Sequence, residues 1–340
     1  MTAESISFEA LVEARKRSAQ TCSELQSRTK RRFPYGLETA LELQGVEKPN
    51  LPPGMTAYKL PVAVLPNVNA KTHLTGINRV IWSFPIETIH IAGTYLCTNP
   101  ACTWAMYSHR LDLQELVVLG DSMTRRDRRL KCASVDDLAE YLERCVLFAQ
   151  GGKLEGRSVR MFPGYRNCVR ALRLIRENTD SSQETRTRLV LPRYGLDIPL
   201  VNYPLSLPGR LKSLYLDMAY PEFKLCIEYE GAHHAGQWLS DIQRRQLIEQ
   251  AGWYMIQVTK YDLVDKFAEA NLAERIANMI GQITGKTVPL TEQKSVRQIS
   301  DTRRLNRKPL WKRLKFQPLL PPGMPQYGDF DDFGLGGELG

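Results

Sequence analysis

The sequence of 340 residues has no hydrophobic run long enough to span a membrane. Its N-terminus also lacks the apolar core of a signal peptide, because an acid occurs early and bases follow soon after. These two absences argue against export and against a membrane partner. We therefore expect a cytoplasmic protein.

Paired cysteines are also lacking. The seven cysteines are an odd number and are scattered along the chain, which predicts reduced thiols. Cys97 and Cys102 are close enough to suggest zinc, but no second Cys or His pair has ligand spacing. The four-residue gap between Cys97 and Cys102 is loose for zinc ligands, and a second ligand pair is missing, so a zinc site is disfavoured. No internal repeat is evident.

Acidic residues are outnumbered, 37 Asp and Glu against 46 Lys and Arg, giving a net charge of +9. A basic balance favours a polyanionic partner, and nucleic acid is the first candidate. Most of the excess lies between Lys286 and Lys315, where ten bases accompany two acids. Four arginines of that segment are the predicted nucleic-acid contacts: Arg303, Arg304, Arg307 and Arg313. A second basic group, residues 28–32, fits either a helix-turn-helix-like unit or a basic arm.

The most informative stretch runs from Leu211 to Leu263. Apolar and polar residues alternate over 213–218, which predicts a strand, and Pro221 then forces a turn before a second strand at 224–230. Residues 241–251 have helical spacing, Gly252 ends that helix, and 253–259 form a third apolar strand. The predicted order is strand, strand, helix, strand.

Three acids in this stretch predict a metal site. If the first two strands pair as a hairpin, Asp217 and Glu228 meet at one end of the sheet, with Glu230 one strand step away. When like charges lie so close together, either the pKa of one carboxyl group rises or the pair binds a cation. A hard ion such as Mg²⁺ or Mn²⁺ takes oxygen ligands. We therefore predict Asp217 and Glu228 as metal ligands. Acids at strand ends can also be merely solvated, and that alternative stays open.

The order of motifs also carries a resemblance to a known family. The motifs are Asp217, Glu228-Tyr229-Glu230-Gly231, His234, Asp241-x-x-Arg244 and Gly252-Trp253. Together they resemble the very-short-patch-repair (Vsr-like) endonucleases of the PD-(D/E)xK superfamily, over roughly residues 180 to 265. The segment from Asp180 to Arg188 is similar to the helix that opens such domains.

The resemblance implies a set of catalytic residues: Glu184, Asp217, Glu228, Glu230 and His234. Glu230 stands where the superfamily has a lysine, so His234 is the implied proton carrier. Arg244 is a candidate phosphate contact, although Asp241 and Arg244 could equally form an ordinary exposed pair on a helix.

Upstream, several helices and strands are predicted. Helices are expected at residues 4–20, 36–44, 100–110, 112–123, 134–148 and 157–178, and strands at 55–68, 78–84 and 88–96. Ser134 and Asp137 form a capping-box pattern. The helical part is weakly similar to the middle region of AbiEi-like antitoxin and regulator proteins. A further helix at 261–283 would cover the C-terminal sheet with apolar residues that include Phe267.

We predict an α/β protein with an α-rich N-terminal part, a small sheet and a C-terminal restriction-endonuclease-like mixed sheet flanked by helices. The predicted boundaries are a basic helical unit at 1–50, a small sheet with helices at 51–178, the nuclease domain at 179–285, and a basic then acidic, largely disordered tail at 286–340. The predicted function is Mg²⁺-dependent DNA cleavage, in defence against foreign DNA. A catalytically silent, antitoxin-like DNA-binding regulator, an RNA nuclease and a homodimeric state all stay open.

Overall fold

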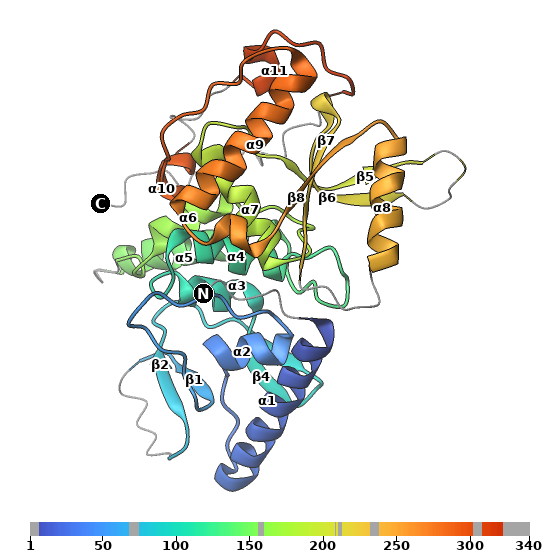
Figure 1. Cartoon of the computed structure of the whole chain (residues 1–340). Helices are drawn as coiled ribbons and strands as arrows, with labels where there is room; N and C mark the ends of the chain where they lie inside the picture. The colour runs from blue at the N-terminus through green and yellow to red at the C-terminus, as the bar shows by residue number, and fades with distance from the viewer. Residues whose placement is uncertain are drawn as a thin grey trace. The chain divides into compact units, whose positions relative to one another are not determined.

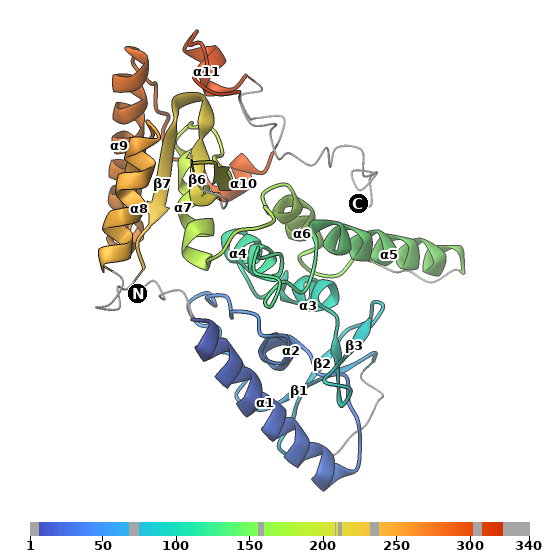
Figure 2. The ribbon, with the colours of Figure 1, turned by 90° about the vertical axis from the view of Figure 1, so that its right-hand side faces the viewer.

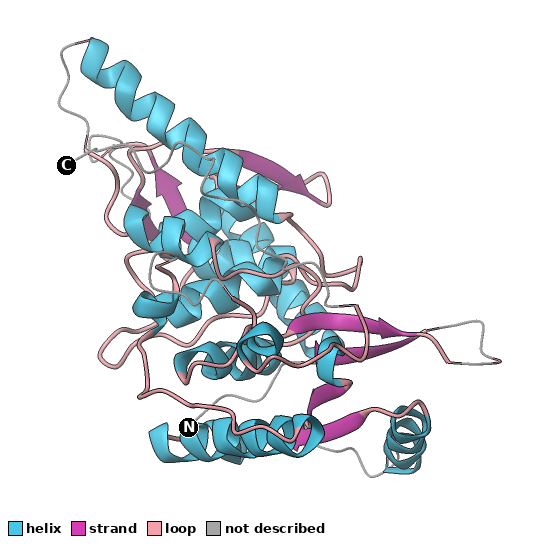
Figure 3. Cartoon of the chain, turned by 90° about the horizontal axis from the view of Figure 1, so that it is seen from above, coloured by secondary structure: helices cyan, strands magenta, loops and turns pink. Residues whose placement is uncertain are grey.

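The structure, a computed structural model, describes residues 7–67, 75–155, 160–207, 209, 213–231, 238–301 and 308–321, without the side chains of 238–241. The chain is α/β, as predicted, and its helices hold many more residues than its strands (Figure 3). It divides into two compact units: the N-terminal unit ends at Glu177 and the C-terminal unit begins at Asn178 (Figure 1). None of the helices in the described ranges combines the length and apolarity that crossing a bilayer needs.

The N-terminal unit begins with two helices and two small sheets (Figure 2). Its first elements are α1 (Phe8–Thr29), α2 (Leu37–Gln44), β1 (Val62–Leu65), β2 (Asn78–Ile81), β3 (Thr88–Ile91) and β4 (Tyr95–Thr98). β1 and β2 pair in parallel, and β3 and β4 pair antiparallel. Buried Tyr35 bridges both pairs through Ala63 and Cys97. Residues on both sides of the predicted boundary at 50 share one core with α1, so the structure has no division there.

Four more helices complete this unit: α3 (Pro100–Tyr107), α4 (Leu113–Met123), α5 (Val135–Leu154) and α6 (Tyr165–Leu172). The capping box predicted at Ser134 and Asp137 is confirmed. α6 is much shorter than the predicted helix at 157–178. Gly164 explains its start, because its φ is +89° and a Cβ there would lie 2.5 Å from the backbone of Ser108.

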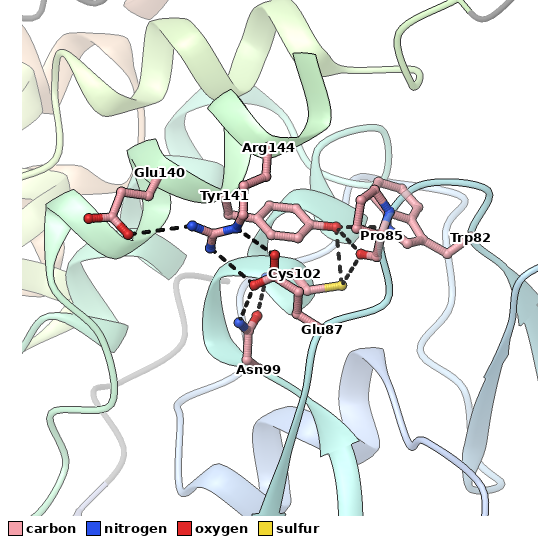
Figure 4. Close-up of polar contacts among 8 residues, drawn as sticks. All are labelled: Trp82, Pro85, Glu87, Asn99, Cys102, Glu140, Tyr141 and Arg144. Carbon is pink, nitrogen blue, oxygen red and sulfur yellow. Dashed lines mark hydrogen bonds and ion pairs between the residues drawn. The ribbon is translucent and has the colours of Figure 1, made fainter. Parts of the chain in front are cut away.

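A polar network, buried at Tyr141 and exposed at Arg144, holds the segment before β3 against α3 and α5 (Figure 4). The Tyr141 hydroxyl accepts from Trp82 Nε1 at 2.8 Å and donates to the Pro85 carbonyl at 2.8 Å. Glu87 accepts from Arg144 Nε at 2.6 Å and from Asn99 Nδ2 at 2.9 Å. Each polar group therefore has a partner inside the unit, and we assign this network a structural role.

The C-terminal unit contains a four-stranded mixed sheet. Its elements are α7 (Ser182–Arg193), β5 (Leu200–Leu205), β6 (Leu214–Tyr220), η1 (Pro221–Phe223), β7 (Leu225–Tyr229), α8 (Trp238–Gln250), β8 (Tyr254–Val258), η2 (Lys260–Leu263), α9 (Lys266–Thr284), α10 (Val296–Ile299) and α11 (Leu310–Arg313). The strand order is β5-β6-β7-β8; the first two pairings are antiparallel and the last is parallel. The predicted order of strand, strand, helix, strand over 211–263 is confirmed, whereas β5 was not predicted.

Helices cover both faces of this sheet (Figure 1). One face, which includes Met218 and Ile227, packs against α7 and α9. The opposite face, with Ala219 and Cys226, packs against Ile248 of α8. This follows from the period of two along each strand, which sends alternate side chains to opposite faces. Glu228 belongs by this period to the α8 face, whereas on β6 the alternation breaks at Asp217, because Leu216 and Ala219 both pack on the α8 face.

The segment after α9 differs from its prediction as a largely disordered tail. Val288, Leu310 and Leu314 are buried in the same core as α7 and α9. Asp197 accepts bonds from the Leu310 amide and from Arg313, which lies 2.9 Å away. The basic composition of the segment concealed these few apolar anchors. Residues 302–307, with Arg303, Arg304 and Arg307, and residues 322–340 lie outside the described ranges.

The start of α9 also differs from its prediction. The helix begins at Lys266 instead of 261, because Asp265 caps it by accepting from the Ala268 amide at 2.8 Å. The preceding residues form η2, which has its own capping box between Thr259 and Asp262. As a result Phe267, predicted to cover the sheet, is 75% exposed.

Substitution of Arg313 tests whether the basic segment after α9 stabilises the fold or binds a polyanion. Arg313→Ala should lower the free energy of unfolding in urea by about 1–3 kcal/mol, because Asp197 then stays largely buried without its cation. Lys308→Ala, which removes an exposed charge near α11, is the control and should unfold like the wild type. Unchanged stability together with weaker DNA binding in Arg313→Ala would restore the predicted nucleic-acid role.

Candidate active site

The hydrogen-bond ladder between β6 and β7 stops where two carboxylates replace it. The register pairs Met218 with Ile227 and goes no further toward the start of β6. One step on, the Asp217 amide donates to Glu228 Oε1 at 3.2 Å, and the Tyr229 amide donates to Asp217 Oδ2 at 3.0 Å. The predicted hairpin is confirmed, and it brings Asp217 and Glu228 together. Each carboxylate is held in place by the backbone of the opposite strand.

Both carboxyl groups are removed from water, and this changes their acidity. Glu228 is 6% exposed and Asp217 is half-buried. Burial raises the pKa of Asp217 to about 6, although the Tyr229 amide and Arg244 oppose the rise. Burial and the neighbouring charge of Asp217 raise the pKa of Glu228 to about 7, against the pull of Arg244. Near neutral pH the pair therefore resists holding two full negative charges.

Glu184 joins this pair from the first turn of α7. Ser181 caps α7 by accepting from the Glu184 amide at 3.1 Å, and Glu184 Oε2 accepts from the Asp180 amide at 3.1 Å. The Glu184 side chain is buried. Burial and the charge of Asp217 hold its pKa well above its usual range. The structure thus brings Glu184, which the resemblance placed at the site, within electrostatic reach of Asp217.

Arg244, on α8, has a partner that the sequence did not reveal. Its Nε and one terminal nitrogen donate to Glu228 Oε2 at 2.9 and 2.6 Å, and it also donates to the Tyr215 carbonyl. The predicted alternatives were a phosphate or Asp241, whose side chain is not described. In the structure Arg244 instead supplies a positive charge to the carboxylate cluster. We use this name for Glu184, Asp217 and Glu228.

The remaining predicted site residues lie at the edge of the cluster or outside the described ranges. Glu230 follows β7 beyond the cluster. Its side chain accepts a hydrogen bond from Gln257 Nε2 at 2.7 Å, and its amide donates to the Val258 carbonyl. Its charge acts to raise the pKa of Asp217. His233 and His234 lie in 232–237, outside the described residues, so the role predicted for His234 stays a prediction.

Two residues near the cluster had no assigned role in the sequence analysis. The charge of Asp180 acts on both Asp217 and Glu184. Asn202, on β5, lies opposite Asp217 between two paired residues and has a φ of +45°. The segment from Asp180 to Arg188 was a usable signal for Asp180, whereas Asn202 had none, because β5 itself was not predicted.

The donor atoms of the carboxylate cluster suit a hard divalent cation. Three buried or half-buried carboxyl groups present only oxygen ligands, and the Arg244 guanidinium offsets part of their charge. Within the described ranges, no three Asp, Glu, His or Cys side chains are arranged closely enough to ligate a metal as they stand. The chemistry of the donors therefore fits Mg²⁺ or Mn²⁺, while in the structure Arg244 holds Glu228.

Comparisons with known proteins leave the function open. No known protein family matches the chain, and no solved structure matches it. Two uncharacterised proteins of Mycobacterium tuberculosis, from strains CDC 1551 / Oshkosh and ATCC 25618 / H37Rv, are each 32% identical over 101 residues. That match covers 29% of this chain and 36% of theirs, so the chain spans about a third of their length.

The raised pKa values give a stability test. For an acid whose pKa is higher in the folded chain, folding takes up protons, so its stabilisation is fully present below the unfolded value, near 4. That contribution is lost as the pH rises through about 6 for Asp217 and about 7 for Glu228. In EDTA, the melting temperature should therefore decline from pH 4.5 to 7.5 more steeply in the wild type than in Glu228→Gln.

Glu249→Gln is the matched control, because Glu249 is an exposed acid on α8 paired with Arg245. It should keep the wild-type slope of melting temperature against pH. Equal slopes in all three proteins would mean that the carboxylate cluster is not strained by its own charge.

Proposed function

We propose that the C-terminal unit is a metal-dependent endonuclease that hydrolyses DNA phosphodiester bonds. The carboxylate cluster is the observation that carries the proposal. Burying acids beside one another is costly unless they are paired, and in this cluster Arg244 pairs directly with Glu228. Groups with strongly raised pKa values in one place are typical of functional sites. A site that takes up a cation with its substrate explains why such a cluster is kept.

In this proposal each residue has a distinct role. Asp217 and Glu228 would hold Mg²⁺ or Mn²⁺ directly, and Glu184 would act through a water molecule. The ion, when bound, would offset charge on the transferring phosphoryl group and lower the pKa of the attacking water. The Tyr229 and Asp217 amides orient the two carboxylates before any ligand arrives. His234 would move the proton, as the resemblance to Vsr-like endonucleases implies.

Arg244 would have two states in this reaction. Without a cation it neutralises Glu228 across distances of 2.6 and 2.9 Å. If Glu228 held a divalent ion, the Arg244 guanidinium would be available to a phosphate oxygen, for which its geometry is suited. The predicted phosphate contact and the observed ion pair are then successive roles of one side chain.

The order of elements also supports the restriction-endonuclease-like assignment. A helix, α7, opens the unit, three antiparallel strands follow, and α8 leads to a parallel strand. This is a mixed sheet flanked by helices, as the resemblance implies. The acids lie where the central strands separate, next to the first turn of the opening helix.

A catalytically silent DNA-binding regulator is the second candidate. The Arg244–Glu228 pair and the backbone bond to Glu184 favour it, since together they let the cluster persist without a cation. Such a protein would bind nucleic acid through its basic segments and would use the acids only to organise the sheet. An RNA nuclease would use the same residues as the DNA enzyme.

Cleavage assays separate these candidates. Full-length protein with plasmid, single-stranded DNA or RNA should cleave DNA in Mg²⁺ or Mn²⁺ and not in EDTA. Asp217→Asn and Glu228→Gln should each lose about a hundredfold in rate or more, while Glu249→Gln stays at wild-type rate. Circular dichroism should find all three folded. Absence of metal-dependent cleavage of any nucleic acid by the wild type would leave the regulator as the better account.

The dual role of Arg244 predicts that removing it lowers the stability of the metal-free protein and increases the stabilisation by Mg²⁺. In EDTA, Arg244→Ala should lower the free energy of unfolding by about 2 kcal/mol, since it leaves buried Glu228 without its partner. Added Mg²⁺ should then raise the melting temperature more than in the wild type. Arg245→Ala, which removes the exposed neighbour on α8, should do neither. Equal Mg²⁺ effects in both variants would contradict the exchange of Arg244 for a cation.

A further inference from the structure

Three large apolar side chains are exposed within one short segment after β8. Tyr261 is 71% exposed, Val264 58% and Phe267 75%, all within seven residues of sequence. Single exposed hydrophobic residues are normal on protein surfaces, but a group of them marks an interaction site. We call these three residues the aromatic patch.

The local backbone holds the aromatic patch outward by capping. Asp262 accepts from the Thr259 amide at 2.8 Å to close η2, and Asp265 caps α9. Arg275, from the second half of α9, binds Asp262 and the Gln257 carbonyl, which ties the turn to β8. Buried Leu263 anchors the turn to the core. The exposure of the three side chains is therefore built into a well-bonded turn.

The aromatic patch lies beyond the same end of the sheet as the carboxylate cluster. β7 and β8 run parallel and pair Tyr229 with Val258, so both strands end together. Glu230 bonds through its amide to Val258 and through its side chain to Gln257. The chain then passes directly from Val258 into η2 and the patch.

Two lysines flank the rings of the aromatic patch. The Lys260 ammonium lies 5.7 Å from the centroid of the Tyr261 ring, and Lys266 is exposed beside Phe267. Of the nearby acids, Asp262 pairs with Arg275 and Glu269 with Arg193, while Asp265 is exposed and caps α9. Rings interleaved with cations are the combination that binds single-stranded nucleic acid, through base stacking and phosphate attraction.

We propose that the aromatic patch stacks on unpaired bases of the strand whose backbone enters the carboxylate cluster. This inference rests on the proposed nuclease function, and it gives the substrate class as single-stranded or locally unpaired DNA. A second copy of the chain is a poorer occupant. Three such side chains expose about 400 Å², against the roughly 800 Å² per partner of a stable interface.

Binding measured in EDTA tests the patch without cleavage. Full-length protein is titrated into fluorescent single-stranded DNA, the matching duplex, and RNA of the same sequence. Tyr261→Ala and Phe267→Ala should each weaken binding to the single strand about tenfold and affect the duplex less. The slope of affinity against salt should stay unchanged, because stacking releases no counterions. Tyr254→Ala removes another exposed tyrosine at the start of β8 and should bind like the wild type.

Phe267→Leu separates stacking from general apolar contact. Leucine keeps apolar surface but has no ring, so it should lose affinity as alanine does. Wild-type affinity in Phe267→Leu, a changed oligomeric state in the alanine variants, or a wild type that binds no oligonucleotide would each overturn the proposal. If RNA binds as tightly as DNA and depends on the same rings, the aromatic patch is still a stacking site, and its substrate is RNA.

The two proposals fail separately. If Asp217→Asn abolishes metal-dependent cleavage while Tyr261→Ala and Phe267→Ala bind single strands normally, the nuclease stands and the patch does not. If nothing is cleaved while both ring variants lose binding, the patch belongs to a binding protein and the nuclease assignment fails.

Discussion

The structure of the C-terminal unit depends on compensating the electrostatic repulsion between Asp217 and Glu228. The two carboxylates face each other where the β6–β7 ladder ends, and each accepts a bond from the backbone of the other strand. Arg244 of α8 contributes the positive charge that makes this arrangement tolerable. Glu184 adds a third acid from α7, and its charge interacts with Asp217. Charged groups from helices on both faces of the sheet therefore act on the same pair of strands. The fold and the candidate chemistry therefore share the same groups.

The end of the sheet concentrates features that a simple structural role does not require. Asp217 and Glu228 of the carboxylate cluster lie where β6 and β7 meet, and the aromatic patch follows β8 at the same end. One offers oxygen ligands and the other offers rings beside Lys260. A nucleic acid strand presents phosphates and bases at a regular spacing, so one strand has chemistry suited to both features. We therefore regard them as two parts of one binding surface.

Local patterns predicted the elements of this unit, whereas contacts between distant segments decided the rest. Gly252 ends α8 as expected, with a φ of +76° that glycine adopts readily. β5 was missed because Asn202 and Pro204 interrupt its alternation, yet pairing with β6 stabilises it. The partner of Arg244 depends on where α8 packs, which no spacing specifies. Phe267 fits the helical period, but a cap at the preceding turn places it in solvent.

Direct metal titration tests the central claim, that the carboxylate cluster is a cation site. Full-length protein and Asp217→Asn are titrated with Mn²⁺ by calorimetry at pH 6 and pH 8. We expect one Mn²⁺ to bind the wild type, more tightly at pH 8 because protons compete for the same oxygens, and Asp217→Asn to lose this binding. Mn²⁺ binding of equal strength in Asp217→Asn, or no binding to the wild type at either pH, would contradict the account.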